Sequence, residues 1–227
     1  MTATTRVLLV RHGATVLSDE DRFAGSSDVA LSETGAEQAR RLGERLRDVP
    51  IARFVASPLV RAVETARRIA APHGAPVVTD AALREIAHGH WEGLRRADVE
   101  ARFPEEYARW ERDPFTFAPE GGETGLAVTA RALPALLALV ADHPGRTILI
   151  VSHKATIRLL LSSLLGFDPR AYRDRLDQSP AALNVLDFRG LEDARLSLFN
   201  DSSHTRDDEA RLPDIPSARL SKRWGDA

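Results

Sequence analysis

The stretch RVLLVRHG at residues 6–13 decides the predicted fold. Its apolar residues from Val7 to Val10 are β-branched at both ends and predict a short buried strand. Arg11, His12 and Gly13 then end the strand and predict a loop that carries polar side chains. Such a strand needs other elements to cover it, so the segments that follow decide which fold is built.

Strands and helices alternate along the rest of the chain. Phe54–Ala56 and Thr147–Val151 are further apolar strands, and each also ends in polar residues. Late strands are predicted at 185–188 and 196–199, where they can pair with each other. The predicted helices are 32–47 with Ser32 as N-cap, 58–73 with Ser57 as N-cap and Pro58 as first residue, 101–112, 124–140 interrupted at Pro134, and 157–165 ending at Gly166.

This alternation predicts an α/β fold, a three-layer α/β/α sandwich around a mainly parallel central sheet. One domain is expected over residues 1–200, because no repeat and no second core is seen. Residues 201–227 are charged, contain Pro213 and Pro216 and show no apolar period, so they are expected to form a C-terminal tail or a wrapping arm.

The composition of the chain excludes several classes of partner and of catalytic group. The chain has 227 residues, 31 basic and 33 acidic, with a net charge of −2. No overall field favours nucleic acid or a membrane surface, so neither is an expected partner. Cysteine is absent, which excludes a disulfide framework and a cysteine nucleophile. Neither a signal peptide nor an apolar run of membrane-spanning length is recognised, so a cytoplasmic location is expected.

Ligands of parallel sheets bind at the carboxyl ends of the strands. Three strand ends carry the polar residues here, at Arg11-His12-Gly13, at Ser57 with the nearby Arg61, and at Ser152-His153. Two arginines and two histidines in one cleft suit a dianion such as a phosphate group. The helix start at Pro58 would add free backbone N–H groups to the same site.

These residues resemble the signature of the histidine phosphatase superfamily, whose fold is phosphoglycerate-mutase-like. The resemblance covers roughly residues 6–190. It rests on several motifs in order, namely Arg11 to Thr15, Leu31 to Gln38, Ser57-Pro58 with Arg61, Glu64 and Thr65, Leu83 to Ile86, Gly89 to Gly93, Gly121 to Glu123, and Val151 to His153.

The resemblance implies a role for each catalytic candidate. His12 would attack phosphorus and form a phosphohistidine, and Glu85 would be the proton donor and acceptor. Arg11 and Arg61 would hold the phosphoryl oxygens, although Arg61 could also pair with Glu64 on its own helix. His153 would be protonated and would stabilise the charge that develops on the transferring group.

Further residues are predicted around the phosphate. Gly13, Thr15 and Gly25 are expected to bind substrate, and Gly122 and Glu123 would support the phosphate loop and the histidines. Lys154, one of two lysines in the chain, would either select substrates with a second anionic group or face solvent. His88 and His90 could suggest a metal pair, but no acidic ligand cluster accompanies them. Neither a metal nor another cofactor is therefore expected.

Hydrolysis of a small phosphorylated metabolite by a metal-independent phosphomonoesterase is the favoured function. The alternative is a mutase that returns the phosphoryl group to another hydroxyl. Mutases of the family have a longer insertion after the general acid than the segment between Glu85 and Gly121. A non-catalytic interaction domain is disfavoured because His12, Arg61, Glu85 and His153 are all present. The oligomeric state cannot be read from the sequence, and the resemblance is compatible with a homodimer.

Overall fold

One mixed sheet forms the centre of the molecule. The computed structural model describes residues 4–17 and 22–205. In these residues the strand order is β3-β2-β4-β1-β5-β6, and the first four strands run parallel while β5 is antiparallel to both neighbours. The strands are β1 (Thr5–Arg11), β2 (Ile51–Ala56), β3 (Val77–Thr79), β4 (Thr147–Ser152), β5 (Leu183–Phe188) and β6 (Ala194–Asp201).

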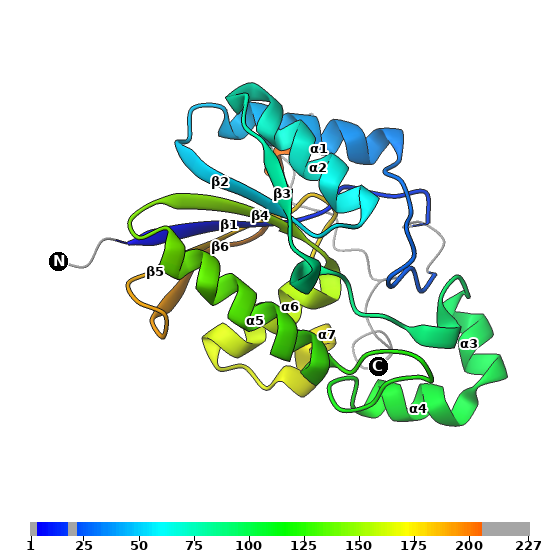
Figure 1. The fold of residues 1–227 in the computed structure, drawn as a ribbon. Coiled ribbons are helices and arrows are strands. Elements are labelled where there is room, and N and C mark those ends of the chain that lie inside the picture. Colours follow the sequence, from blue (N-terminus) through cyan, green and yellow to red (C-terminus); the bar gives the residue numbers. More distant parts are fainter. Residues whose placement is uncertain (1–3, 18–21, 206–227) are drawn as a thin grey trace.

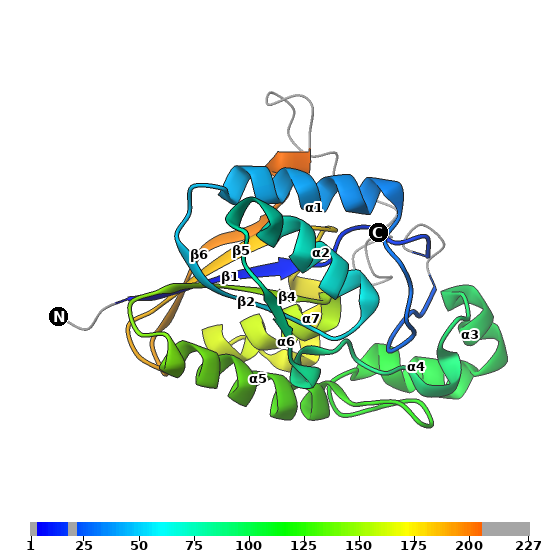
Figure 2. The same ribbon diagram turned by 45° about the horizontal axis from the view of Figure 1, so that its top comes forward.

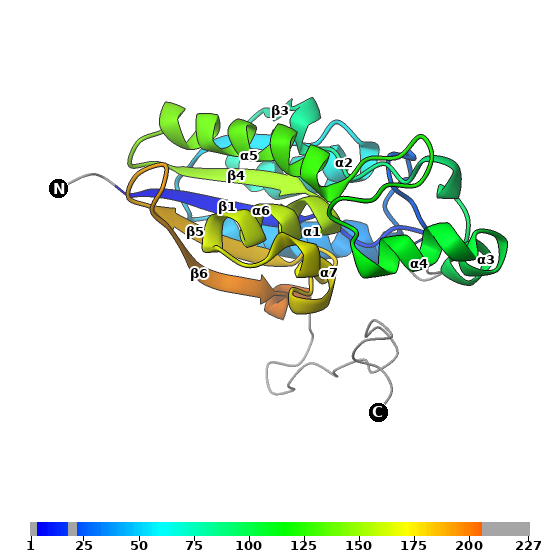
Figure 3. The same cartoon turned by 90° about the horizontal axis from the view of Figure 1, so that it is seen from below.

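Helices cover both faces of this sheet. The elements α1 (Glu33–Leu46) and α2 (Val60–Ala70) lie on one face, and α5 (Gly125–Asp142), α6 (Lys154–Leu165) and α7 (Tyr172–Arg175) lie on the other (Figure 1). Figure 2 shows α1 and α2 on the first face, and Figure 3 shows the opposite layer. The predicted three-layer α/β/α sandwich with a mainly parallel sheet is confirmed.

Side chains along β1 alternate between two hydrophobic cores, one on each face of the sheet. Val7 and Leu9 pack with the α5 and α6 layer, whereas Leu8 and Val10 pack with α1 and α2. All four are at most 4% exposed. Successive residues of a strand point to opposite faces, so a strand that is apolar at every position requires a covering layer on each side.

A smaller helical unit lies beyond the carboxyl ends of the parallel strands (Figure 1). It contains α3 (Arg96–Arg102) and α4 (Pro104–Arg112), and its aromatic core includes Phe23, Trp91 and Trp110. The prediction of one continuous helix over 101–112 is wrong. Pro104 disfavours helical backbone at the residue before it, so Phe103 adopts φ −130° and ψ 55° and breaks the helix.

The start of α2 also differs from the prediction. The helix begins at Val60 and not at Pro58, ends at Ala70, and is followed by a 3₁₀ turn, Ala71–His73. Ser57 does not cap it in the expected way. Instead the carboxylate of Asp28, from a distant loop, accepts the Val60 N–H at 2.7 Å. An acidic side chain therefore occupies the helix end that was expected to attract phosphate.

Several local predictions are correct. The Ser32 hydroxyl accepts the N–H of Gly35 at the start of α1, and α6 ends at Gly166 in the left-handed conformation. β5 and β6 pair with each other, and β6 extends to Asp201. A short 3₁₀ turn, Ser203–Thr205, follows, while the rest of the predicted tail lies outside the described residues.

The helix α5 continues through Pro134 without ending. By length and apolar composition alone it could cross a membrane, and it is the one such helix in the described ranges. Ala132, Leu136 and Val140 from one side of α5 are buried in the core against the sheet. This packing is what a core helix of an α/β sandwich requires.

Candidate active site

A pocket of about 250 Å³ lies where the carboxyl ends of β1 and β4 meet the α3–α4 unit. Its position agrees with the expected ligand site of a parallel sheet. Arg11, His12, Arg61 and Glu85, which lie far apart in the sequence, all line it. The remaining lining residues are Thr15, Leu17, Arg22, Phe23, Ala24, Gly25, His88, Arg96, Trp110, Lys154, Ala155, Arg158, Tyr172 and Arg173.

His12 presents a neutral imidazole to this pocket. Its Nδ1 lies 2.7 Å from the carbonyl oxygen of Gly13, which can only accept, so Nδ1 carries the proton and the lone pair is on Nε2. Burial holds the pKa of His12 well below 6.5, and the positive charges of Arg11 and Arg61 lower it further. The unprotonated Nε2 is the nitrogen that can act as a nucleophile.

The loop after β1 can hold His12 because glycine follows it. A Cβ on Gly13 would lie 2.4 Å from the carbonyl oxygen of Gly35, which is too close for another residue. The N–H of Gly13 donates to the hydroxyl of Thr65 at 3.1 Å, and that hydroxyl donates to the carbonyl of Arg61 at 2.7 Å. Gly13 therefore positions the loop, and Thr65 joins the loop to α2.

Arg61 is buried and is held by backbone carbonyls. Its Nη1 donates to Ser27 at 2.7 Å and its Nη2 donates to Gly25 at 2.8 Å. Gly25 has φ +45°, which favours glycine, and its carbonyl thus orients the guanidinium. The alternative pairing of Arg61 with Glu64 is wrong, because Glu64 binds Arg68 instead.

Arg11 is oriented by a segment that follows α7. Its Nη1 donates to the carbonyl of Gln178. The side chains of Gln178 and Asn184 bond to each other twice at 2.9 Å, and Asn184 also donates to the carbonyl of Leu9 in β1. This buried amide pair was not recognised in the sequence. The signal that could have found it is a polar residue, Asn184, between the apolar Leu183 and Val185.

Glu85 lies at the N-terminus of α6. Its Oε2 accepts the N–H of Ala155 at 3.1 Å, and its Oε1 accepts the N–H of Thr156 at 3.2 Å. The Thr156 hydroxyl is 3.2 Å from Oε1 and 2.8 Å from the carbonyl of Arg84. The free N–H groups at the helix start thus fix a carboxyl group at the edge of the pocket.

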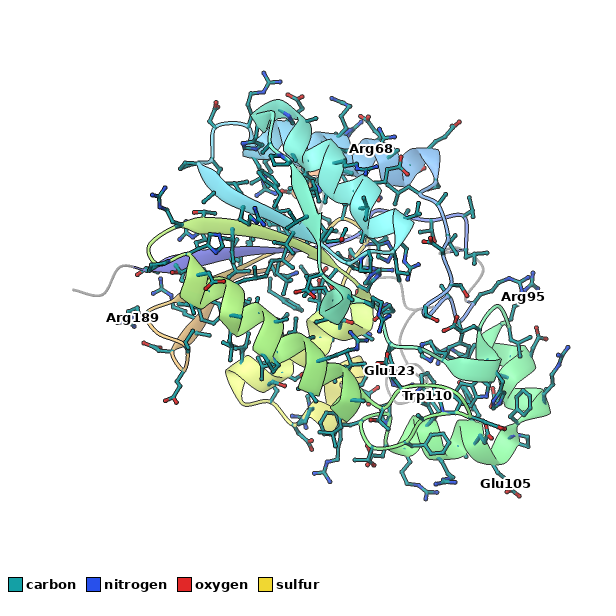
Figure 4. All side chains as sticks on the ribbon, in the orientation of Figure 1. Arg68, Arg95, Glu105, Trp110, Glu123 and Arg189 are labelled. Carbon is teal, nitrogen blue, oxygen red and sulfur yellow. The ribbon has the colours of Figure 1, made fainter. Side chains whose placement is uncertain are left out.

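Arg131 on α5 holds the segment that carries Glu85. It donates to the carbonyls of Ala82, Arg84 and Glu85 at 2.6–3.1 Å. Glu123 accepts from the same guanidinium at 2.9 Å. Glu123, which lies just before α5 (Figure 4), therefore supports the Glu85 segment through Arg131.

The imidazole ring of His153 lies next to that of His12, with the two ring centroids 5.1 Å apart. It is fully buried, and its Nε2 lies 2.7 Å from the hydroxyl of Ser57. Burial, together with His12, Arg61 and Arg11, holds its pKa well below 6.5. These surroundings favour the neutral form of the imidazole, and burial is the largest cause. The charge of His153 with a substrate bound stays a prediction.

The sequence of this chain matches a known protein family. The model of the histidine phosphatase superfamily (branch 1) matches residues 7–202. The chain belongs to this superfamily. The predicted family is thus confirmed.

Two of the curated relatives of this chain are proteins of Mycobacterium tuberculosis. A bifunctional protein is 35% identical over 202 residues, which are 88% of this chain and 55% of the relative. The chain therefore spans about half the length of that relative. A glucosyl-3-phosphoglycerate phosphatase is 36% identical over 168 residues, 70% of this chain and 75% of the relative.

A solved structure gives the same fold. The protein YhfR of Bacillus stearothermophilus superposes with a TM-score of 0.84 at 30% sequence identity, covering 89% of this chain and all of that one. The phosphoglycerate-mutase-like architecture of this chain is therefore shared along most of its length.

The two histidines of the His88-Gly89-His90 segment lie in different surroundings. His88 lines the pocket, and burial lowers its pKa to about 4. His90 instead pairs with Glu106 at 3.1 Å. Residues 4–17 and 22–205 contain no group of three or more His, Cys, Asp or Glu side chains that could hold a metal ion. His88 and His90 thus contact different neighbours.

Thr15 and Lys154 both line the pocket. Thr15 is 4% exposed, at the end of the loop that carries His12. Lys154 is the first residue of α6 and pairs with Asp177 at 3.6 Å. Of the two readings of Lys154, the geometry favours a side chain at the site over one that faces only solvent.

Proposed function

We propose that this histidine phosphatase is a metal-independent phosphomonoesterase that acts through a phosphohistidine on His12. The observation that carries the proposal is the neutral, buried imidazole of His12 with Nε2 free, in one pocket with two arginines and a carboxyl group. The relative named as a glucosyl-3-phosphoglycerate phosphatase supports a small phosphorylated metabolite as the substrate.

The first step forms a bond between His12 Nε2 and phosphorus. The bond from phosphorus to the ester oxygen breaks, and protonated Glu85 donates its proton to that leaving oxygen. Arg11 and Arg61 bind the phosphoryl oxygens and offset their charge, the task that a metal ion performs in other phosphatases. Backbone carbonyls orient both guanidiniums before the substrate arrives.

The second step releases phosphate. Glu85, now ionised, accepts a proton from water while the water oxygen attacks phosphorus and the bond to Nε2 breaks. His12 returns to its neutral form, and Glu85 regains its proton. We propose that the neutral His153 next to His12 becomes charged only when the phosphate dianion is bound, because the dianion offsets Arg11 and Arg61.

The test is a phosphate-release assay on a panel of phosphorylated metabolites, with and without EDTA. We expect activity in wild type that EDTA leaves intact and that His12→Ala abolishes. Mass spectrometry of an acid-free quench should find a phosphoryl group on His12. With para-nitrophenyl phosphate, whose leaving group needs no proton, this intermediate should accumulate in Glu85→Gln. Loss of activity with EDTA would exclude the metal-free mechanism, and activity in His12→Ala would exclude the nucleophile. A mutase would instead convert 3-phosphoglycerate to 2-phosphoglycerate with little free phosphate.

A further inference from the structure

The pocket wall formed by α6 and α7 carries more positive charge than a single phosphate group requires. Lys154 and Arg158 lie one helical turn apart on α6, and Arg173 lies on α7. All three line the pocket, and we call them the cationic wall. The Lys154 Nζ and the Arg158 Nη2 share the carboxylate of Asp177, at 3.6 Å and 3.1 Å. The carboxylate of Asp177 is 68% exposed to water and is the shared ion-pair partner of both cations.

Each of the two arginines of the wall has at least one buried N–H group without an acceptor. Arg173 Nη2 donates to Glu111 at 3.1 Å, but its Nε and Nη1 are buried without a hydrogen-bond partner. The guanidinium stacks 3.7 Å from the ring centroid of Trp110. Arg158 is 9% exposed, and its buried Nε also has no partner. Buried guanidinium N–H groups without acceptors cost free energy, and an anion in the pocket would offset part of their charge.

The surroundings of Lys154 also disfavour its charged form. Burial lowers its pKa to about 7, and the positive charges of Arg158 and Arg11 act in the same direction, against Asp177. A lysine in these surroundings gains from a further negative neighbour, because the neighbour favours its charged form.

The cationic wall is separate from the groups that would hold the phosphoryl group. Those groups come from the end of β1 and from α2, where Arg61 is fixed by the loop at residues 25–27. Glu85 contacts the first residues of α6, so it lies beside the wall. A leaving oxygen at Glu85 therefore directs the organic part of the substrate along α6.

We propose that the cationic wall binds a second anionic group of the substrate, so that this enzyme prefers phosphomonoesters that also carry a carboxylate or a second phosphate. The inference rests on the proposed function, which places the phosphoryl group at His12. Trp110, Phe23 and Tyr172 line the same pocket and supply an apolar surface for the carbon skeleton between the two anions.

The kinetic experiment uses two matched substrate pairs. The first pair is 3-phosphoglycerate, which carries a carboxylate as its second anionic group, and glycerol 3-phosphate, which lacks it. The second pair is fructose 1,6-bisphosphate, which carries a second phosphate, and fructose 6-phosphate, which lacks it. We expect wild type to prefer the doubly anionic member of at least one pair by about tenfold or more in kcat/KM. The pair that shows the preference identifies the anion.

Variants then assign the preference to the wall. Arg158→Gln and Lys154→Gln should each lower the ratio of kcat/KM within the responsive pair by about tenfold. Arg170→Gln is the matched control, because the exposed Arg170 pairs with Asp168 and does not line the pocket. It should leave the ratio unchanged. A ratio near one for both pairs in wild type, or a ratio that no wall variant alters, would overturn the inference.

Binding measurements separate this inference from the proposed function. Calorimetric titration of His12→Gln protein with the same pairs needs no turnover. If wild type hydrolyses para-nitrophenyl phosphate but His12→Gln binds both members of each pair equally, the proposed function stands and the cationic wall is refuted. If wild type hydrolyses nothing but the binding preference is present and is lost in Arg158→Gln, the wall stands and the proposed function fails.

Discussion

Arg131 donates a hydrogen bond to the backbone carbonyl of Glu85, 46 residues away in the sequence, with its Nη2 3.1 Å from that oxygen. The same guanidinium also binds the carbonyl of Arg84 and the carboxylate of Glu123. Arg131 touches no expected substrate position. It is a positioning residue that fixes the segment carrying the proposed proton donor.

Replacing Arg131 should therefore lower kcat more than it changes KM. In Arg131→Ala the Glu85 segment loses three hydrogen bonds, and a misplacement of about 1 Å can cost about a hundredfold in rate. We expect kcat to fall by about tenfold to a hundredfold, with a shifted limb of the pH profile of kcat. The control is Arg68→Ala on α2 (Figure 4), which removes only the exposed pair with Glu64. An unchanged kcat in Arg131→Ala would show that Glu85 needs no such support.

Gly25 should not tolerate a side chain. A Cβ there would lie 2.3 Å from a carboxylate oxygen of Glu92, and φ is +45°, so Gly25→Ala strains the loop whose carbonyl orients Arg61. We expect at least a tenfold loss of kcat/KM on para-nitrophenyl phosphate, in line with the loss of one oriented charged contact, about 1.5–3 kcal/mol. Gly190→Ala is the control, because nothing lies within 4 Å of its added Cβ. Equal activity of the two variants would contradict this role of Gly25.

Thr65 should matter for stability as well as for activity. Thr65→Val keeps the shape of a fully buried residue but leaves the N–H of Gly13 without an acceptor. The free energy of unfolding should fall by about 1–3 kcal/mol, measured by urea denaturation. Thr129→Val is a suitable comparison, since it removes only a bond to the carbonyl of Gly125 within α5. If both variants lose the same small amount of stability, the bond from Gly13 to Thr65 contributes little.

His12 should stay neutral in acid. Its pKa lies well below 6.5 because of burial and of the charges of Arg11 and Arg61, so the neutral nucleophile persists as the pH falls through 6.5 and is lost only at lower pH. Titration of the ¹⁵N-labelled free protein, with His12→Gln to assign the signal, should show this ring in its neutral form at pH 6. A ring that titrates at 6.5 like an exposed histidine would contradict the neutral nucleophile in its present form.

The strands, most helices and the principal site residues could be predicted from the sequence, because apolar periodicity and capping are local. The strand from Val7 to Val10 requires two covering layers whatever surrounds it, and Ser32 and Gly166 act through their own neighbours. The order of the motifs also identified His12, Arg61 and Glu85 as one group. The local rules failed where a long-range contact prevailed, as at Ser57, whose hydroxyl lies against His153, and at Val60, which Asp28 caps.

The tertiary structure alone decided what supports and charges the site. Arg131 and Asn184 act on residues 46 and 175 positions away, and no local pattern encodes such pairs. The protonation of His12 and His153 depends on their burial and on the arginines brought near them by folding. The cationic wall likewise exists only because α6 and α7 meet at the pocket. The sequence by itself determined which chemical groups the protein has, and folding determined their spacing, their solvation and therefore their charge.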